Sequence, residues 1–151
     1  MTERFFKILT HEGVPPYTNS LCWLNVRPTK DGPGKWLEYH GRIRWCKNGF
    51  HLARQFAVGE FLYAYGVASQ SVRGSLWVYE AEVDMNMSAF MHKSPDKICV
   101  KRVRLLHRVC TVSQSILLRA SGRCRPIDSL QIYFGRMLRN FDPKKRRAGS
   151  S

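Results

Sequence analysis

The stretch SLWVYEAEVDM, residues 75–85, alternates apolar and acidic side chains over most of its length. On an extended chain, one face would carry five apolar side chains: Trp77, Tyr79, Ala81, Val83 and Met85. The opposite face would carry the carboxylates Glu80, Glu82 and Asp84. This period of two is typical of a β-strand. The stretch therefore predicts a sheet as the base of the fold, and we expect that sheet to be mainly antiparallel.

Shorter apolar segments on both sides of this stretch predict the other strands. They lie at residues 5–9, 21–26, 36–41, 43–45, 49–53 and 97–109. Asn48 and Gly49 form a dipeptide typical of a tight hairpin turn, and this turn would lead into the segment that begins at Gly49.

Residues 53–66 change from the period of a strand to the period of a helix. Ala57, Phe61 and Ala64 would share one helical stripe, and Gly66 would end the helix as a C-terminal cap. Gly59 weakens this pattern, because a glycine inside a helix costs about 1 kcal/mol relative to alanine.

Two further helical segments, 111–121 and 126–141, follow the last predicted strand. Pro126 suits the first turn of a helix, and Asp128 would lie near the positive end of its dipole. The apolar stripe of the second segment consists of Ile127, Leu130, Phe134, Met137 and Leu138.

These elements together predict an α+β fold: a mainly antiparallel sheet with one packed helix, plus a C-terminal helical pair. The 151 residues suit a domain of ordinary size, and a hydrophobic content of 44% is enough for a core. We expect an α+β core domain at 1–109, a basic helical extension at 110–141 and a disordered basic tail at 142–151.

The sequence predicts a cytoplasmic protein without a membrane partner. No apolar run approaches the roughly 18 residues that a membrane-spanning helix needs. The first ten residues contain Glu3 and lack the long apolar region of a signal peptide. The five cysteines are odd in number and widely spaced, so we expect reduced thiols, without a disulfide framework and without a metal site.

Positive charge is concentrated in the last third of the chain. Residues 1–97 hold 12 Lys/Arg and 9 Asp/Glu, whereas residues 98–151 hold 13 Lys/Arg and 2 Asp/Glu. Such a net charge of +11 over one segment favours a polyanionic partner, because binding to phosphates releases condensed counterions. The candidate nucleic-acid-binding residues are Lys101, Arg102, Arg104, Arg108, Arg119, Arg123, Arg125, Arg136, Arg139, Lys144, Lys145, Arg146 and Arg147.

Cys46 and His51 form a second candidate group, within the stretch RWCKNGFHLAR at 44–54. A histidine can activate a thiol at hydrogen-bond distance, which would make the pair catalytic. A zinc site would need further ligands, and the chain has no closely spaced cysteine or histidine pairs. We favour the third interpretation, in which a buried cysteine ends one strand and the histidine begins the next.

Glu80 and Glu82 are the third candidate group. Carboxylates at positions i and i+2 share one face of a strand and could act together in catalysis. The alternative, which we favour, is an acidic face paired across the sheet with Arg102 and Arg104.

Several motifs resemble a family of small phage and prophage proteins of unknown function. They are the first strand FFKIL, the pattern C-x-x-G-F-H at 46–51, VYEAEV and the ending DKICVKRVRLL, and the resemblance covers residues 4–109. The same order also resembles the ADP-ribosyltransferase fold. That second resemblance implies an NAD cofactor, with Glu80, Glu82 and His51 as catalytic residues and Lys7 or His11 at the first-strand position.

We therefore expect a non-catalytic protein that contacts the backbone of nucleic acid, or that acts in host takeover. We expect it in the cytoplasm of an infected bacterium. This function needs no cofactor. One alternative is an NAD-dependent ADP-ribosyltransferase-like enzyme. A second alternative is an inhibitor or virion component that docks on an acidic protein surface of the host.

Overall fold

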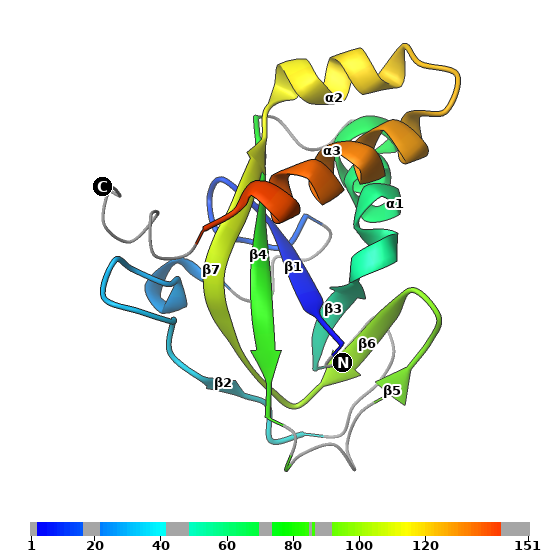
Figure 1. Ribbon diagram of the computed structural model, residues 1–151. Helices are drawn as coiled ribbons and strands as arrows, with labels where there is room; N and C mark the ends of the chain where they lie inside the picture. Colours follow the sequence, from blue (N-terminus) through cyan, green and yellow to red (C-terminus); the bar gives the residue numbers. More distant parts are fainter. Residues whose placement is uncertain are drawn as a thin grey trace.

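The computed structural model describes residues 3–16, 22–41, 49–69, 74–84, 86 and 92–142. Within these residues, seven strands form one sheet in which all pairings are antiparallel (Figure 1). The strands are β1 (Phe5–Thr10), β2 (Leu37–Glu38), β3 (Phe50–Arg54), β4 (Leu76–Val83), β5 (His92–Lys93), β6 (Lys97–Val100) and β7 (Arg102–Val112). They lie in the order β2-β7-β4-β1-β3-β6-β5.

Most of the helical elements gather at one end of this sheet (Figure 1). They are the 3-10 turn η2 (Gln55–Ala57), helix α1 (Val58–Tyr63), the π-helical turn η3 (Ala64–Ala68), and helices α2 (Gln114–Ser121) and α3 (Pro126–Asn140). The 3-10 turn η1 (Leu24–Val26) lies apart from them, beyond β7 (Figure 1). The hydroxyl of Ser113 caps α2 by accepting a hydrogen bond from the amide of Ile116 at 3.3 Å. The α+β class predicted from the sequence is confirmed.

Strand β4 is covered on both faces, which the alternation of its sequence does not reveal. Leu76 and Val78 belong to a hydrophobic cluster between the sheet and the helices. Tyr79, Ala81 and Val83 belong to a second cluster on the opposite face. Neighbouring strand residues point to opposite faces, so the central strands separate two cores.

The first cluster makes the C-terminal helices part of the same core as the sheet. Phe134 of α3 is fully buried, and its ring makes a T-shaped contact with the Phe6 ring of β1, with the ring centroids 5.0 Å apart. Leu117 of α2 and Leu130 of α3 are buried in this cluster with Val78. The boundary expected after residue 109 falls inside β7, which continues to Val112.

In the helical segment after β3, the buried side chains differ from those of the predicted stripe. Val58 and Leu62 are its fully buried side chains, whereas Phe61 is only partly buried. The segment begins with a 3-10 turn and ends with a π turn, and both change the number of residues per turn. Gly66 lies inside the π turn and is therefore not the predicted cap.

Two strand predictions are also wrong or too long. The described part of segment 21–26 forms the turn η1, and the preceding Trp23 is buried in the second cluster. The segment 36–41 contributes only the two residues of β2. Segment 43–45 and Asn48 lie outside the described residues, as does the tail from residue 143.

None of the helices in the described ranges is long and apolar enough to cross a membrane.

Candidate nucleic-acid interface

The helices α2 and α3 and the turn between them present a group of exposed arginines. They are Arg119, Arg123, Arg125, Arg136 and Arg139. Among the described residues, only Arg125 has an ion-pair partner, Asp128 at 3.7 Å. The other four guanidinium groups are open to an external anion, because no described carboxylate neutralises them.

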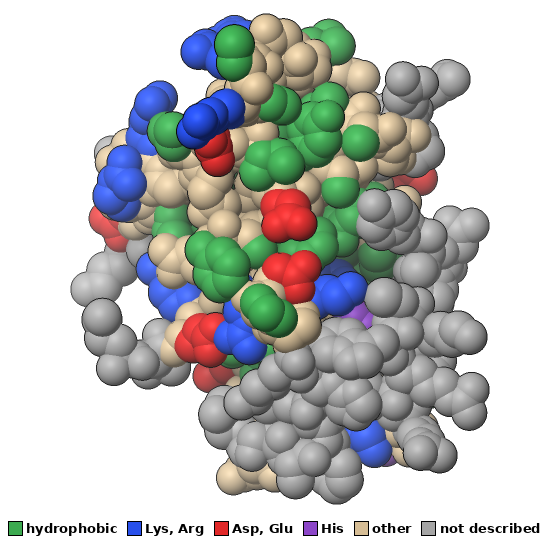
Figure 2. All heavy atoms as spheres, turned by 90° about the vertical axis from the view of Figure 1, so that its right-hand side faces the viewer, with side chains coloured by type: hydrophobic (Ala, Val, Ile, Leu, Met, Phe, Trp, Pro, Cys, Tyr) green, Lys and Arg blue, Asp and Glu red, His purple; other side chains and the backbone are tan. Residues whose placement is uncertain are grey.

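Helix α3 arranges part of this group on one face. Ile132, Arg136 and Arg139 follow one another at spacings of four and three residues, which places them on neighbouring turns. Ile132 is 60% exposed, so this face is both basic and partly apolar. Figure 2 shows Lys and Arg side chains along one rim of the helical end, beside hydrophobic side chains.

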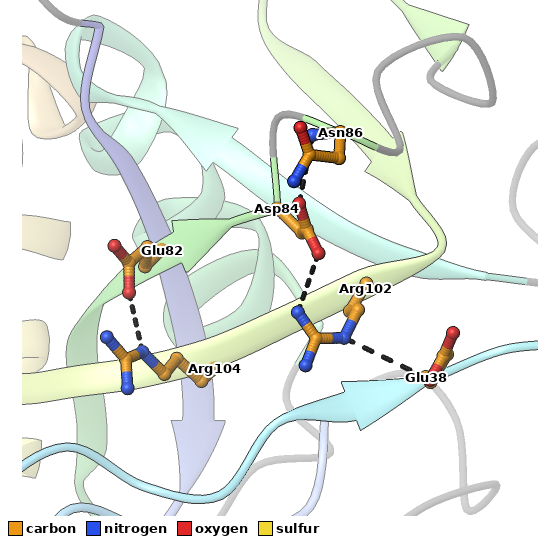
Figure 3. Close-up of polar contacts among 6 residues, drawn as sticks. All are labelled: Glu38, Glu82, Asp84, Asn86, Arg102 and Arg104. Atoms are coloured by element: carbon orange, nitrogen blue, oxygen red, sulfur yellow. Dashed lines mark hydrogen bonds and ion pairs between the residues drawn. The ribbon is translucent and has the colours of Figure 1, made fainter.

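The arginines at the start of β7 have a different environment. The Nη1 atom of Arg102 lies 2.6 Å from Asp84 Oδ2, and the Nε atom of Arg104 lies 2.5 Å from Glu82 Oε1 (Figure 3). Arg102 also approaches Glu38 at 4.0 Å. The Glu82–Arg104 pair agrees with the cross-sheet pairing that we favoured, whereas Arg102 pairs with Asp84 and not with Glu80.

An indole ring completes this ionic cluster. The guanidinium carbons of Arg102 and Arg104 lie 4.1 Å and 4.8 Å from the centre of the Trp36 ring. Cation–π contact and neighbouring carboxylates together compensate both positive charges. Arg102 and Arg104 therefore contribute less to an anion-binding surface than the sequence suggested.

Of the remaining candidates, two lie within the described residues and four lie outside them. Arg108 is partly exposed and lies over the Trp77 ring at 4.6 Å. Lys101 is partly exposed at the bend between β6 and β7, where its carbonyl accepts a hydrogen bond from Tyr39 at 2.7 Å. Four candidates lie outside the described residues: Lys144, Lys145, Arg146 and Arg147.

Glu80 is buried within an ionic network on the helix side of β4. Arg4 donates to both of its carboxylate oxygens at 2.8 Å, and His107 Nε2 lies 2.9 Å from Oε1. Burial alone would raise the pKa of Glu80, but the hydrogen bonds of Arg4 and His107 outweigh it and lower the pKa to about 2. Glu80 is therefore ionised at neutral pH, and its hydrogen bonds connect β4 to β7 and to Arg4, the residue before β1.

Glu82 shares the strand face of Glu80 but not its partners. Its carboxylate accepts a hydrogen bond from Arg104, and its side chain is 43% exposed. Each of the two glutamates therefore has a basic partner of its own on a neighbouring strand. This arrangement gives a structural reason for the ExE pattern that needs no catalysis.

His51 lies on β3 opposite Cys99 of β6, with its Nδ1 atom 3.9 Å from the sulfur. Its pKa is lowered to about 4, mainly by burial and further by the charges of Lys7 and Lys97. Lys7 donates to the His51 carbonyl at 2.9 Å, and burial lowers the pKa of this lysine to about 8. Cys46 lies outside the described residues, so its distance from His51 stays a prediction.

Groups with three or more potential metal ligands are also absent from the part of the chain that the structure describes.

Several members of these clusters were not expected from the sequence. Arg4 and His107 lie 76 and 27 positions from Glu80, and Trp36 lies 66 positions before Arg102. No local motif marks such residues. Only the strand register brings them together, and that register follows from long-range packing.

A scan against protein-family models found no match, and searches of curated proteins and of solved structures also found none. The resemblances to phage proteins and to ADP-ribosyltransferases therefore stay predictions from the sequence.

Proposed function

We propose that this protein binds the phosphate backbone of nucleic acid, and that α2, α3 and the turn between them form the contact surface. The observation that supports this most directly is the set of exposed arginines without a described carboxylate partner: Arg119, Arg123, Arg136 and Arg139. Arginine can bind phosphate through two parallel N–H groups, so it suits this contact better than lysine does.

The distribution of ion pairs favours this surface over the sheet. The arginines at the start of β7 are held by carboxylates of β2 and β4, so binding there would first require breaking those pairs. Among the described residues, no carboxylate competes for the arginines of α2, α3 and the turn between them, apart from Asp128 in the weak pair with Arg125. The contacts would be to phosphates, which position a protein on its target without reading the bases.

The salt dependence of binding tests this proposal. Four phosphate contacts on a duplex predict a slope of about −3.6 for the logarithm of the binding constant against the logarithm of salt concentration. Fluorescence anisotropy with a short labelled DNA duplex, and with a single-stranded RNA of equal length, would measure the slope for both. Absence of binding at low salt, or binding that salt does not weaken, contradicts the proposal.

Matched charge variants separate this surface from net charge. The double variant Arg136→Gln/Arg139→Gln should reduce the magnitude of the slope by roughly 1.8. The control Lys30→Gln/Lys35→Gln removes the same charge from exposed positions in the loop before β2 and should change the slope much less. Equal effects of the two variants would mean that the contact is not localised on α3.

A docking site for an acidic protein is the second candidate, and the exposure of Leu118 (66%) and Ile132 (60%) supports it. Apolar side chains beside arginines are typical of protein interfaces. A pull-down from a bacterial lysate with and without nuclease treatment distinguishes the candidates. Capture that survives complete nuclease digestion favours the protein partner, whereas capture that digestion removes favours nucleic acid.

A further inference from the structure

A second arginine–tryptophan cluster lies away from the helical pair. Arg27, just after η1, has its guanidinium carbon 5.4 Å from the centre of the Trp77 ring, and Arg108 of β7 lies 4.6 Å from the same centre. Trp77 packs against the second hydrophobic cluster, on the opposite face of the sheet from the helix-side core. Both arginines and the indole are partly exposed, so solvent reaches them.

Tyr79 adds a hydroxyl group to this cluster. Tyr79 is buried, with 3% of its surface exposed, and the charges of both Arg27 and Arg108 act on its hydroxyl group. Burial raises the pKa of Tyr79 in spite of these charges, so the phenol keeps its proton at neutral pH. Two cations therefore lie beside one indole, and the neutral hydroxyl of Tyr79 is close enough to respond to both charges.

The Trp77 cluster differs from the Trp36 cluster in the carboxylates that lie beside its arginines. At Trp36, carboxylates of Glu38, Glu82 and Asp84 lie beside the two arginines (Figure 3). At Trp77, neither Arg27 nor Arg108 has a carboxylate partner among the described residues. Two like charges gathered around one ring repel each other, and a bound anion would relieve that repulsion.

The cluster is also not needed to attach its loop to the sheet. The amide of Gly34 donates to the Leu105 carbonyl at 2.8 Å, and the amide of Tyr39 donates to the Lys101 carbonyl at 2.7 Å. These backbone hydrogen bonds hold the segment after Arg27 against β7 without any guanidinium group. Arg27 can therefore be replaced without releasing the loop.

We propose that Arg27 and Arg108 form a binding site for a phosphate monoester, beside the ring of Trp77. A monoester carries a charge of about −1.5 to −2 and three acceptor oxygens, which matches two guanidinium groups. A backbone diester carries a single charge and matches the site less well. The site thus differs in ligand from the arginines of α2 and α3, and it does not depend on the function proposed for them.

Isothermal titration calorimetry with inorganic phosphate, against sodium chloride of equal ionic strength, tests the site. Wild-type protein should show saturable binding of one phosphate, and Arg27→Gln should weaken it about tenfold or more, as expected when a charge-assisted hydrogen bond is lost. Lys35→Gln removes the same charge from an exposed position in the loop before β2, outside both proposed surfaces, and should leave phosphate affinity unchanged. Absence of saturable binding, or an equal loss in both variants, overturns the proposal.

Two further experiments test the role of the guanidinium group and identify the source of the phosphate monoester. Arg108→Lys preserves the charge but not the planar fork, and should weaken binding several-fold while the protein stays folded. A mononucleotide 5′-phosphate and an oligonucleotide with or without a 5′-terminal phosphate identify the source of the monoester. A preference for the phosphorylated oligonucleotide that disappears in Arg27→Gln points to a nucleic-acid end. Equal binding of mononucleotide and oligonucleotide points to a free monoester.

Discussion

Glu80 shows how strongly neighbours on other strands decide the state of a single residue. It stands in a row of acidic residues on β4, yet it is the one whose side chain is most buried and most fully hydrogen-bonded. Its partner Arg4 is the residue before β1, and its partner His107 lies on β7. The ring of His107 in turn stacks on Phe141 at 4.5 Å, so the network extends to the residue after α3.

Glu80→Gln should destabilise the protein at neutral pH and much less in acid. The pKa of Glu80 is about 2 in the folded protein against an ordinary value of 4.5. Between these values the unfolded chain binds a proton that the folded protein does not, so stability is lost as the pH falls. We expect the free energy of unfolding to drop by about 1–3 kcal/mol at pH 7 and the difference to shrink towards pH 3.

Urea unfolding at both pH values measures this effect. Glu82→Gln serves as the control, because the Glu82–Arg104 pair is more exposed and should contribute less than about 1 kcal/mol. A loss of the same size at both pH values would contradict the assigned ionisation of Glu80.

At the scale of elements, the contact between α1 and α3 depends on a glycine. The amide of Gly59 donates to Gln131 Oε1 at 2.6 Å, and the Nε2 group of Gln131 donates to the Gln55 carbonyl at 2.9 Å. A β-carbon on Gly59 would lie 2.6 Å from the backbone nitrogen of Gln131. The glycine that weakens the helical pattern of the sequence is therefore the residue that lets the two helices approach.

Gly59→Ala should destabilise the protein despite the higher helix propensity of alanine. The clash involves the backbone of α3, which cannot move aside as a flexible side chain would, so we expect a loss of about 1–3 kcal/mol. Gly135→Ala is the matched control within α3, since its β-carbon would meet only the Arg139 side chain at 3.6 Å. That variant should be neutral or stabilised by up to about 1 kcal/mol. Thermal unfolding of both variants decides the point, and equal behaviour would contradict the close packing of α1 and α3.

For the whole molecule, the helix-side core ties the basic helices to the sheet. Phe134, Leu130 and Leu117 are buried in the same cluster as Phe6, Ile8 and Val78. Removing the helices would expose that face of the central strands to water. The binding surface proposed above therefore belongs to the folding unit, and point substitutions are the appropriate way to test it.

A chain that ends at Val112 should fail to fold. It lacks the buried side chains of α2 and α3, and each of the larger ones contributes about 2–5 kcal/mol, against a total stability of about 5–15 kcal/mol. A chain that ends at Asp142 is the control, because it retains every described residue. Dispersion of amide signals in NMR spectra distinguishes folded from unfolded chains. A well-dispersed spectrum for the shorter chain would show that residues up to Val112 fold alone.

The sequence by itself determined the features that depend on neighbours along the chain. The alternation of β4 placed Tyr79 and Glu80 on opposite faces, and the helical period of 126–141 identified Phe134 and Leu138 as buried. The concentration of positive charge in the last third is likewise a property of the sequence alone. Such features could be predicted because periodicity reports directly which way a side chain points.

Only the tertiary structure decided which charges remain available to a partner. The sequence presents Arg102, Arg108 and Arg136 alike, yet one is paired with carboxylates, one faces a tryptophan beside Arg27, and one is exposed on a helix. Compensation of a charge depends on groups within a few ångströms in space, and strand register brings those groups together from distant positions in the chain. The carboxylates around Trp36 and their absence among the described residues around Trp77 follow from that register, which no local pattern encodes.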